Sequence, residues 1–234
     1  MVAGRVAALD WKGIAAELDA HGCAVAAAIL SSAECEALAA LYASEDRFRS
    51  RIVMARHGFG RGEYKYFAYP LPETVAALRT ALYRRLAGIA NRWNEAMGIG
   101  LSYPDEHADF LHRCHRAGQT QPTPLLLQYG AGDYNCLHQD LYGEHVFPLQ
   151  ATFLLSASGK DFTGGEFVLT EQRPRMQSRA EVVPLGQGDG VIFAVHHRPV
   201  RGARGSDRVK LRHGVSRLRS GYRRTLGIIF HDAR

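Results

Sequence analysis

Long apolar runs are missing from this sequence of 234 residues. The longest, Cys23–Leu30, has eight residues, whereas a helix that crosses a membrane needs about 20. The first residues also lack the apolar core and small-residue cleavage site of a secretory signal peptide. We therefore expect neither a membrane span nor export, and we predict a cytoplasmic protein.

Cysteine is scarce, and its spacing shows no C-x-x-C pair. The four cysteines are Cys23, Cys35, Cys114 and Cys136. This pattern predicts free thiols in a reducing compartment rather than a disulfide framework. Cys136 lies two residues before His138 and could share its face. We expect it to be a small buried hydrophobic residue, with an extra metal ligand as the alternative.

Internal repeats and linkers are also absent, and the hydrophobic content of 46% is ordinary for a globular protein. The sequence therefore predicts one domain over 1–234. Helical signals gather in 1–120, which we interpret as a mainly helical extension with a short hairpin. Strand signals gather in 121–234. Helices followed by strands favour an α+β fold, with the helices packed on one face of a strand core.

Helix starts are marked in the first part of the chain. Asp10 is placed to cap a helix that runs to about His21, and Ser31-x-x-Glu34 is a capping box. Apolar residues at helical spacing predict a long amphipathic helix over Glu73–Met97. Asp105–Arg116 is predicted to form another.

Short apolar runs separated by glycine-rich turns predict strands in the second part of the chain. Several such strands favour an all-β sandwich or barrel. The predicted strands are Leu125–Tyr129, Ala151–Leu155, Thr163–Leu169, Gly188–Phe193 and Arg223–Phe230.

A His-x-Asp pair and a distant histidine stand out among the polar residues. His138 and Asp140 flank Gln139, and His213 follows 75 positions after His138. On an extended segment, residues i and i+2 point the same way, so His138 and Asp140 can aim at one point. Two imidazoles and a carboxylate are the ligand set of a mononuclear non-haem iron site, which leaves positions open for reactants. Arg223, ten residues later, offers a planar fork for a carboxylate.

Five ordered motifs make residues 129–231 resemble the double-stranded β-helix (jelly-roll, cupin-like) core of the 2-oxoglutarate- and Fe(II)-dependent dioxygenases. The resemblance is greatest to the prolyl 4-hydroxylase branch. The whole chain also resembles a bacterial group of oxygenases linked to nucleic acid. The motifs are Tyr129-Gly130-x-Gly132 before His138-x-Asp140, Gly164-Gly165-Glu166, Gly188-Asp189-x-x-Ile192-Phe193, His213-Gly214-Val215-Ser216 and Ser220-Gly221-Tyr222-Arg223.

The resemblance implies a role for each matching residue. His138, Asp140 and His213 would be the catalytic iron ligands. Arg223 would pair with the C5 carboxylate of 2-oxoglutarate, and Tyr129 would give that carboxylate a hydrogen bond. The implied reaction couples decarboxylation of 2-oxoglutarate to succinate with hydroxylation, or oxidative demethylation, of a substrate. Dioxygen is the co-reactant, and ascorbate is a candidate reductant.

Arg224 is the rival of Arg223 for the cosubstrate. Strand alternation turns the two side chains to opposite faces, so only one can point into the core. The small residues Thr225 and Gly227 share the face of Arg223. We therefore favour Arg223.

Positive charge is concentrated near the end of the chain. Between Arg173 and Arg224 there are thirteen Lys or Arg and three Asp or Glu, and Arg198–Arg212 is the densest part. This segment is either a solvated, flexible loop or a basic surface near the site for nucleic acid or an acidic protein. It contains no aromatic residue for stacking on single strands.

Three alternatives for the activity follow. Similarity to prolyl hydroxylases favours protein hydroxylation, whereas the basic segment favours nucleic-acid demethylation. The Arg-x-Asn-x-x-x-x-Arg motif of base-repair demethylases is missing after His213, which speaks against base repair. The same fold also serves as a catalytically inactive cupin-type binding module, but the full ligand set argues against that.

The glycine-rich segment Gly58–Gly62 lacks the spacing of a nucleotide-binding loop. We expect a mobile hairpin tip. The alternative is a substrate lid, in which case Arg61, Tyr64 and Tyr66 would be candidate substrate contacts.

Overall fold

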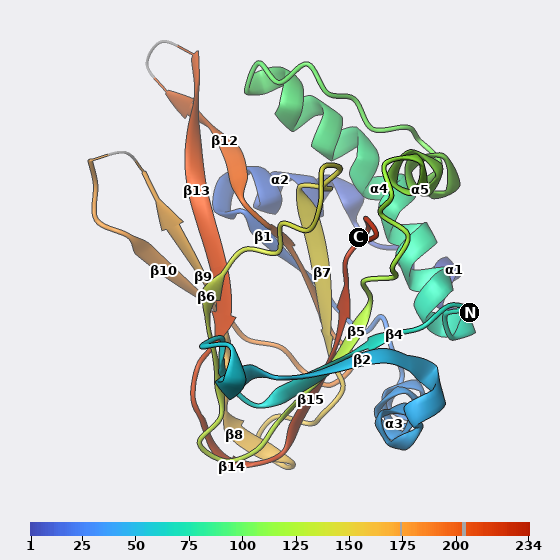
Figure 1. Ribbon diagram of the computed structural model, residues 1–234. Helices are drawn as coiled ribbons and strands as arrows, with labels where there is room; N and C mark the ends of the chain where they lie inside the picture. Colours follow the sequence, from blue (N-terminus) through green and yellow to red (C-terminus); the bar gives the residue numbers. More distant parts are fainter. Residues whose placement is uncertain (174, 203–204) are drawn as a thin grey trace.

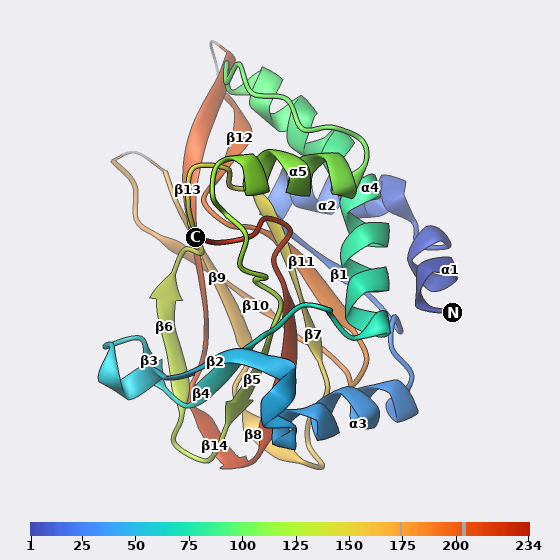
Figure 2. The same ribbon diagram turned by 45° about the vertical axis from the view of Figure 1, so that its right-hand side comes forward.

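Two antiparallel sheets face each other, and the helices cover the outer side of the larger sheet (Figures 1 and 2). The computed structural model describes residues 1–173, 175–202 and 205–234. Within them, the larger sheet has the order β1 (Cys23–Ala26), β11 (Gly190–Ala194), β7 (Leu149–Leu154), β15 (Arg223–Ile228), β5 (Leu125–Tyr129), β4 (Glu63–Phe67) and β2 (Phe48–Val53). The predicted α+β architecture is confirmed.

The smaller sheet carries six of the thirteen basic residues between Arg173 and Arg224. Its order is β10 (Arg179–Val183), β9 (Phe167–Gln172), β13 (Gly205–Val215), β6 (Tyr134–His138) and β3 (Gly60–Arg61), and β12 (His197–Gly202) also pairs with β13. Strand β13 is long enough for β12 and β6 to pair with successive parts of it. A separate ribbon joins β8 (Phe162–Gly164) and β14 (Leu218–Gly221).

Two of the helices begin where the sequence marks their caps. The Asp10 side chain accepts a hydrogen bond from the Gly13 amide at 3.0 Å, and Ser31 and Glu34 form the predicted capping box. None of the helices in the described ranges is long and apolar enough to cross a membrane. The helices are α1 (Val2–Ala7), α2 (Trp11–His21), α3 (Ser32–Ala40), α4 (Glu73–Ala96) and α5 (His107–Arg116), with short 3₁₀ turns η1 (Leu41–Ala43), η2 (Glu45–Arg47) and η3 (Met54–Arg56).

Strand β15 lies at the centre of the larger sheet and has two different faces. Leu226 and Ile228 join the main hydrophobic core, which also contains the apolar face of α4. Arg223, Thr225 and Gly227 line a cavity between the two sheets. This alternation is the one that strand geometry requires, and it determines which arginine faces the cavity.

The first 120 residues complete both sheets in addition to supplying helices. Strand β1 pairs with β11, β4 pairs with β5, and β3 pairs with β6. The helical part and the strand part of the chain are therefore joined by hydrogen bonds across the sheets.

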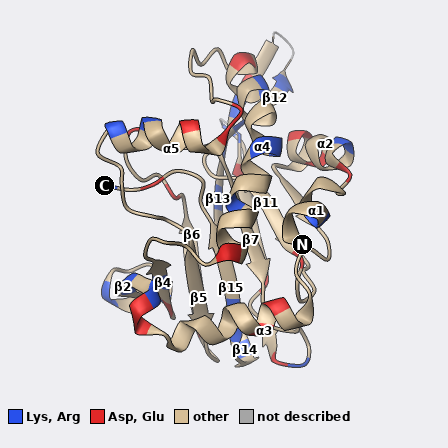
Figure 3. Cartoon of the chain, turned by 90° about the vertical axis from the view of Figure 1, so that its right-hand side faces the viewer, with Lys and Arg blue, Asp and Glu red and all other residues tan. Residues whose placement is uncertain are grey.

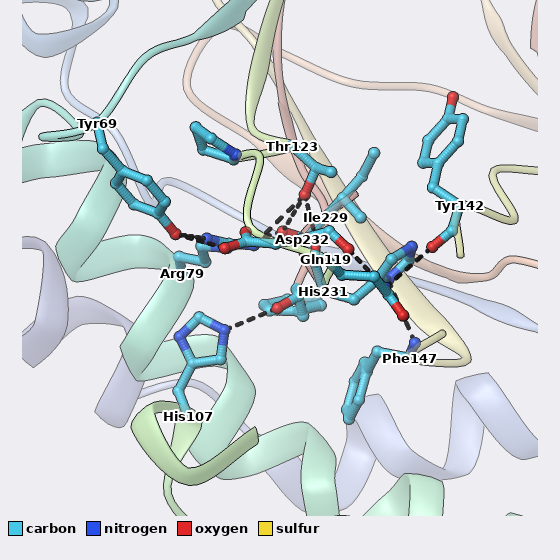
Figure 4. A network of polar contacts seen from close by, with 12 residues as sticks. Tyr69, Arg79, His107, Gln119, Thr123, Tyr142, Phe147, Ile229, His231 and Asp232 are labelled. Carbon is cyan, nitrogen blue, oxygen red and sulfur yellow. Dashed lines mark hydrogen bonds and ion pairs between the residues drawn. The ribbon is translucent and has the colours of Figure 1, made fainter. Parts of the chain in front are cut away.

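A buried polar network ties the C-terminal segment to α4 (Figure 4). The Arg79 guanidinium donates to the Asp232 carboxylate at 2.7 Å and to the Ile229 carbonyl at 2.8 Å. Tyr69 and His115 also bond to the Asp232 carboxylate, at 2.9 and 2.8 Å. A buried charge of this kind is stable only when it is paired and hydrogen-bonded, and here both conditions hold.

Candidate metal centre

The structure brings the predicted ligands His138, Asp140 and His213 together. Strand pairing places His213 opposite His138, and the centroids of the two imidazole rings are 4.2 Å apart. The Asp140 carboxylate lies 3.5 Å from Nε2 of His138 and 3.4 Å from Nε2 of His213. One ligand atom from each residue lies within 4.8 Å of the others. This spacing suits a single metal ion.

Hydrogen bonding orients His138 for coordination. Its Nδ1 atom lies 2.8 Å from the carbonyl oxygen of Cys136, to which it can donate. The Nε2 atom then carries the free lone pair and faces Asp140. A backbone acceptor on the second nitrogen is typical of histidines that bind metals.

Cys136 itself is exposed, so the prediction of a buried thiol was wrong, because this end of β6 lies at the rim of the sheet.

The electrostatics favour the protonation states that a metal needs. Burial raises the pKa of Asp140, but the hydrogen bond and charge interaction with His213 outweigh it and hold the pKa well below its usual range. Burial lowers the pKa of His213. An ionised carboxylate and a neutral imidazole therefore face each other at neutral pH, ready to act as ligands.

Arg223 carries a buried charge into the same cavity. Its side chain is 2% exposed, and its Nε and Nη1 atoms have no hydrogen-bond partner in the part of the chain that the structure describes. Burial lowers the pKa of Arg223 to about 10, so it remains a cation at neutral pH. A buried guanidinium without acceptors indicates a site for an anion. Arg224 points away, and its Nε donates to Gln128 at 3.0 Å.

Tyr129 lies beside Arg223 because β5 pairs with β15 at this position. The guanidinium carbon is 5.7 Å from the centroid of the Tyr129 ring. The phenol is fully buried and its hydroxyl accepts a hydrogen bond from Asn135 at 3.4 Å. The cavity that contains both residues and the three candidate ligands has a volume of about 350 Å³.

The glycine-rich segment lies at the rim of this cavity. Gly60 and Arg61 form β3, which pairs with β6, so the segment is part of the sheet edge and not an unpaired tip. Gly58 and Phe59 line the cavity, as do Tyr64 and Tyr66 on β4. Of the candidate substrate contacts, the two tyrosines lie at the cavity, whereas Arg61 is exposed and does not line it.

Sequence reasoning missed two residues at the site. The Tyr142 hydroxyl donates to Asp140 at 2.7 Å, and Gln150 on β7 is buried with its Oε1 atom unpaired among the described residues. The i+2 spacing from Asp140 was a signal for Tyr142. No signal in the sequence marked Gln150, because only the packing of the two sheets brings β7 to the cavity.

The basic segment is a β-hairpin, which corrects the expectation of a flexible loop. Ala203 and Arg204 lie outside the described residues. Arg198 is buried in a pair with Glu171, and it donates to the Asp19 carbonyl at 2.6 Å. This arginine therefore supports the fold and is not available to a partner.

Three basic residues of β13 do remain exposed. Val209 and Leu211 point into the core, so Arg208, Lys210 and Arg212 occupy the opposite face of the strand. Figure 3 shows both charge signs scattered over the helices on the other side of the molecule. The row on β13 is thus a local concentration of one sign.

Solved structures share this fold at low sequence identity. A crystal structure of a Pseudomonas putida prolyl-4-hydroxylase is 15% identical, with a TM-score of 0.54, over 96% of this chain and 99% of that chain. An oxidoreductase of the 2OG-Fe(II) oxygenase family from Burkholderia pseudomallei is 16% identical, with a TM-score of 0.57, over 97% and 94%. The fold is the double-stranded β-helix of the 2-oxoglutarate/Fe(II) oxygenases.

Comparison with protein families is more specific. Residues 62–233 match a family described as an oxygenase catalysing oxidative methylation of damaged DNA. An uncharacterized protein of Mycobacterium tuberculosis is 50% identical over 167 residues, which are 71% of this chain and 72% of that protein. The chain belongs to this oxygenase family and is an enzyme.

Proposed function

We propose that this oxygenase uses Fe(II), 2-oxoglutarate and dioxygen to hydroxylate, or oxidatively demethylate, its substrate. His138, Asp140 and His213 would hold the iron, and Arg223 with Tyr129 would hold the C5 carboxylate of 2-oxoglutarate. The observation that carries this proposal is the buried, unpaired guanidinium of Arg223 in the same cavity as the three convergent ligands.

The residues present fit both groups. Two imidazole nitrogens and one carboxylate are the donors of a non-haem Fe(II) site, and three positions of an octahedral ion stay open. A 2-oxo acid and dioxygen need three. The Arg223 fork can bind a carboxylate through two parallel hydrogen bonds, and its Nε and Nη1 atoms have no acceptor among the described residues.

The bound metal and cosubstrate would supply the redox chemistry: oxidative decarboxylation of 2-oxoglutarate to succinate and carbon dioxide, with one oxygen atom passing to a substrate C–H bond. The protein orients the reactants and limits water. Phe167 and Phe193 line the cavity beside His213. If the oxidised carbon is a methyl on a heteroatom, the product loses formaldehyde, which is demethylation. Ascorbate is the candidate reductant.

We infer a nucleic-acid substrate in preference to an acidic protein. The family is described as acting on damaged DNA, and β13, which carries the candidate ligand His213 on its inner face, has an exposed row of three cations on its outer face. Phosphate contacts by Lys and Arg supply most sequence-independent affinity for DNA.

We also place the protein in the cytoplasm, since its cysteines are free thiols.

Succinate release tests the proposed function. Protein purified without oxygen and loaded with Fe(II) should release succinate when 2-oxoglutarate and air are added. Asp140→Ala should abolish that release because a metal ligand is lost, whereas Asp105→Ala, at an exposed position, should retain it. Succinate release that survives in Asp140→Ala would refute the ligand assignment. A wild-type protein that binds no iron and releases no succinate would favour the inactive cupin-type module.

A further inference from the structure

Tyr142 contacts the carboxylate of a candidate metal ligand. It follows Asp140 by two residues, and its hydroxyl donates to Oδ1 of that carboxylate at 2.7 Å. Oδ1 is also the oxygen near His138, whereas Oδ2 lies 3.4 Å from Nε2 of His213. The Tyr142 hydroxyl therefore hydrogen-bonds to Oδ1 of Asp140 and leaves Oδ2 free of that contact.

The Tyr142 hydroxyl is itself held in place. The Tyr66 hydroxyl donates to it at 3.2 Å, so its own single proton is committed to Asp140. The two rings meet edge-on with centroids 6.5 Å apart. The guanidinium of Arg49 lies over the Tyr66 ring, 4.5 Å from its centroid. A chain of contacts thus runs from β2 to the metal centre.

The backbone at Tyr142 is fixed by a fully buried glutamine (Figure 4). Nε2 of Gln119 donates to the carbonyls of Tyr142 at 3.2 Å and Asp232 at 2.6 Å. Its Oε1 accepts from the amides of Glu144 at 2.9 Å and His145 at 2.7 Å. This side chain joins the loop after Asp140 to the buried C-terminal network.

Gly143 is what lets the glutamine approach so closely. Its φ of +86° is a conformation that favours glycine. A Cβ at this position would overlap the amide of Gln119. The loop between Asp140 and Phe147 is thus shaped around one buried side chain, and Tyr142 is held both at its backbone and at its hydroxyl.

We propose that Tyr142 is a positioning residue that holds the Asp140 carboxylate so that Oδ2 is the oxygen offered to iron. The inference rests on the proposed function. A carboxylate that bound through both oxygens would occupy one more position of the ion and leave too few for 2-oxoglutarate and dioxygen. The hydrogen bond from Tyr142 engages Oδ1 and opposes that second contact.

Cobalt substitution tests this role without relying on turnover. Full-length protein loaded with Co(II) is compared with Tyr142→Phe and with Tyr69→Phe. Tyr69→Phe is the control. It also removes one tyrosine hydroxyl, but that hydroxyl donates to Asp232 and not to Asp140. We expect Tyr142→Phe to change the visible Co(II) spectrum and to raise the Kd for Co(II) about tenfold or more. Tyr69→Phe should keep the wild-type spectrum and Kd.

The outcomes separate the two proposals. A wild-type Co(II) spectrum and Kd in Tyr142→Phe would overturn the positioning role alone, as would equal changes in Tyr69→Phe. If the wild type binds no Co(II), the proposed function fails and the positioning role with it. Should Tyr142→Phe not fold, Tyr66→Phe takes its place. Tyr66→Phe removes the hydroxyl that donates to Tyr142 and should raise the Kd for Co(II) by a smaller factor. An unchanged Kd in Tyr66→Phe would count against the positioning role of Tyr142.

Discussion

Arg223 holds a positive charge in an interior that gives it few partners. Its neighbours in the cavity wall include Tyr129, Thr225 and Gly227, none of which can neutralise a cation. Leaving a charge in such surroundings costs free energy. A carboxylate ligand that binds in the cavity beside Arg223 offsets that cost. Arg223 therefore favours the binding of an anion in the interior of the cavity.

Arg223→Lys should raise the KM for 2-oxoglutarate about tenfold or more. A lysine keeps the charge but loses the two-pronged geometry, and hydrogen bonds to charged groups contribute about 1.5–3 kcal/mol. Succinate release measured against 2-oxoglutarate concentration gives the KM. Arg224→Lys is the matched control and should change it less than twofold. The opposite ranking of the two variants would assign the cosubstrate to Arg224.

Side-chain direction at this site could be read from the sequence, but hydrogen-bond partners could not. Alternation along a strand put Arg223 and Arg224 on opposite faces, and the small residues Thr225 and Gly227 indicated that the face of Arg223 is the inner one. The spacing of His138 and Asp140 was enough to aim them together. The bonds from Gln119 to the loop beyond Asp140 depend on how that loop packs against the C-terminal segment, and no local pattern encodes this packing.

His107, the first residue of α5, couples that helix to the end of the chain. Its Nε2 lies 2.8 Å from the Phe230 carbonyl, and its ring lies 4.8 Å from that of Tyr83. Burial, helped by the charge of Arg79, lowers the pKa of His107 to about 3. The folded protein therefore keeps this imidazole neutral at pH values at which the unfolded chain protonates it, since the unperturbed pKa is about 6.5.

Stability should consequently fall as the pH drops below about 6.5, because the unfolded state takes up a proton that the folded state refuses. Above that pH the contribution of His107 is fully present. Between pH 6.5 and 5 this one group should cost about 2 kcal/mol of unfolding free energy. His107→Gln keeps an amide donor for Phe230 without a titration. Urea unfolding at several pH values should show a slope smaller by about one proton in the variant, and identical slopes would contradict the assignment.

Elements with a clear start signal were predictable, whereas the β12–β13 hairpin was not recognised. The capping residues Asp10 and Ser31 gave the starts of α2 and α3. The β12–β13 hairpin was interpreted as a loop because its charge density masked the strand pattern. The alternation of Val209 and Leu211 with exposed basic residues was the signal that could have identified it.

Backbone hydrogen bonds join the first 120 residues to the rest of the chain within both sheets. Strands from the first 120 residues lie at both edges of the larger sheet and at one edge of the smaller sheet. We propose that residues 1–234 form a single domain, since cutting at position 120 would remove paired strands from both sheets. Their order could not be predicted, because pairing partners far apart in sequence are chosen only when the sheets assemble.

Charge on the smaller sheet should govern binding to DNA. The logarithm of affinity falls with the logarithm of salt concentration by about 0.9 per phosphate contact. Replacing Arg208, Lys210 and Arg212 with Gln should reduce that slope by up to about 3. The control replaces three exposed cations on the helical side, Lys12, Arg85 and Arg116, and should leave the slope unchanged. Equal effects of both triple variants, or no binding at low salt, would exclude β13 as the contact surface.

Gly143 shows how far the demands of the metal centre extend. It bears no chemical group, yet one added methyl there would push Gln119 out of place and free the loop that carries Tyr142. The sensitivity of a position in this enzyme to substitution should therefore not follow its distance from the candidate metal ligands. A mutational scan should find a glycine as sensitive as a histidine, and a directed-evolution library aimed at new substrates should leave that position untouched.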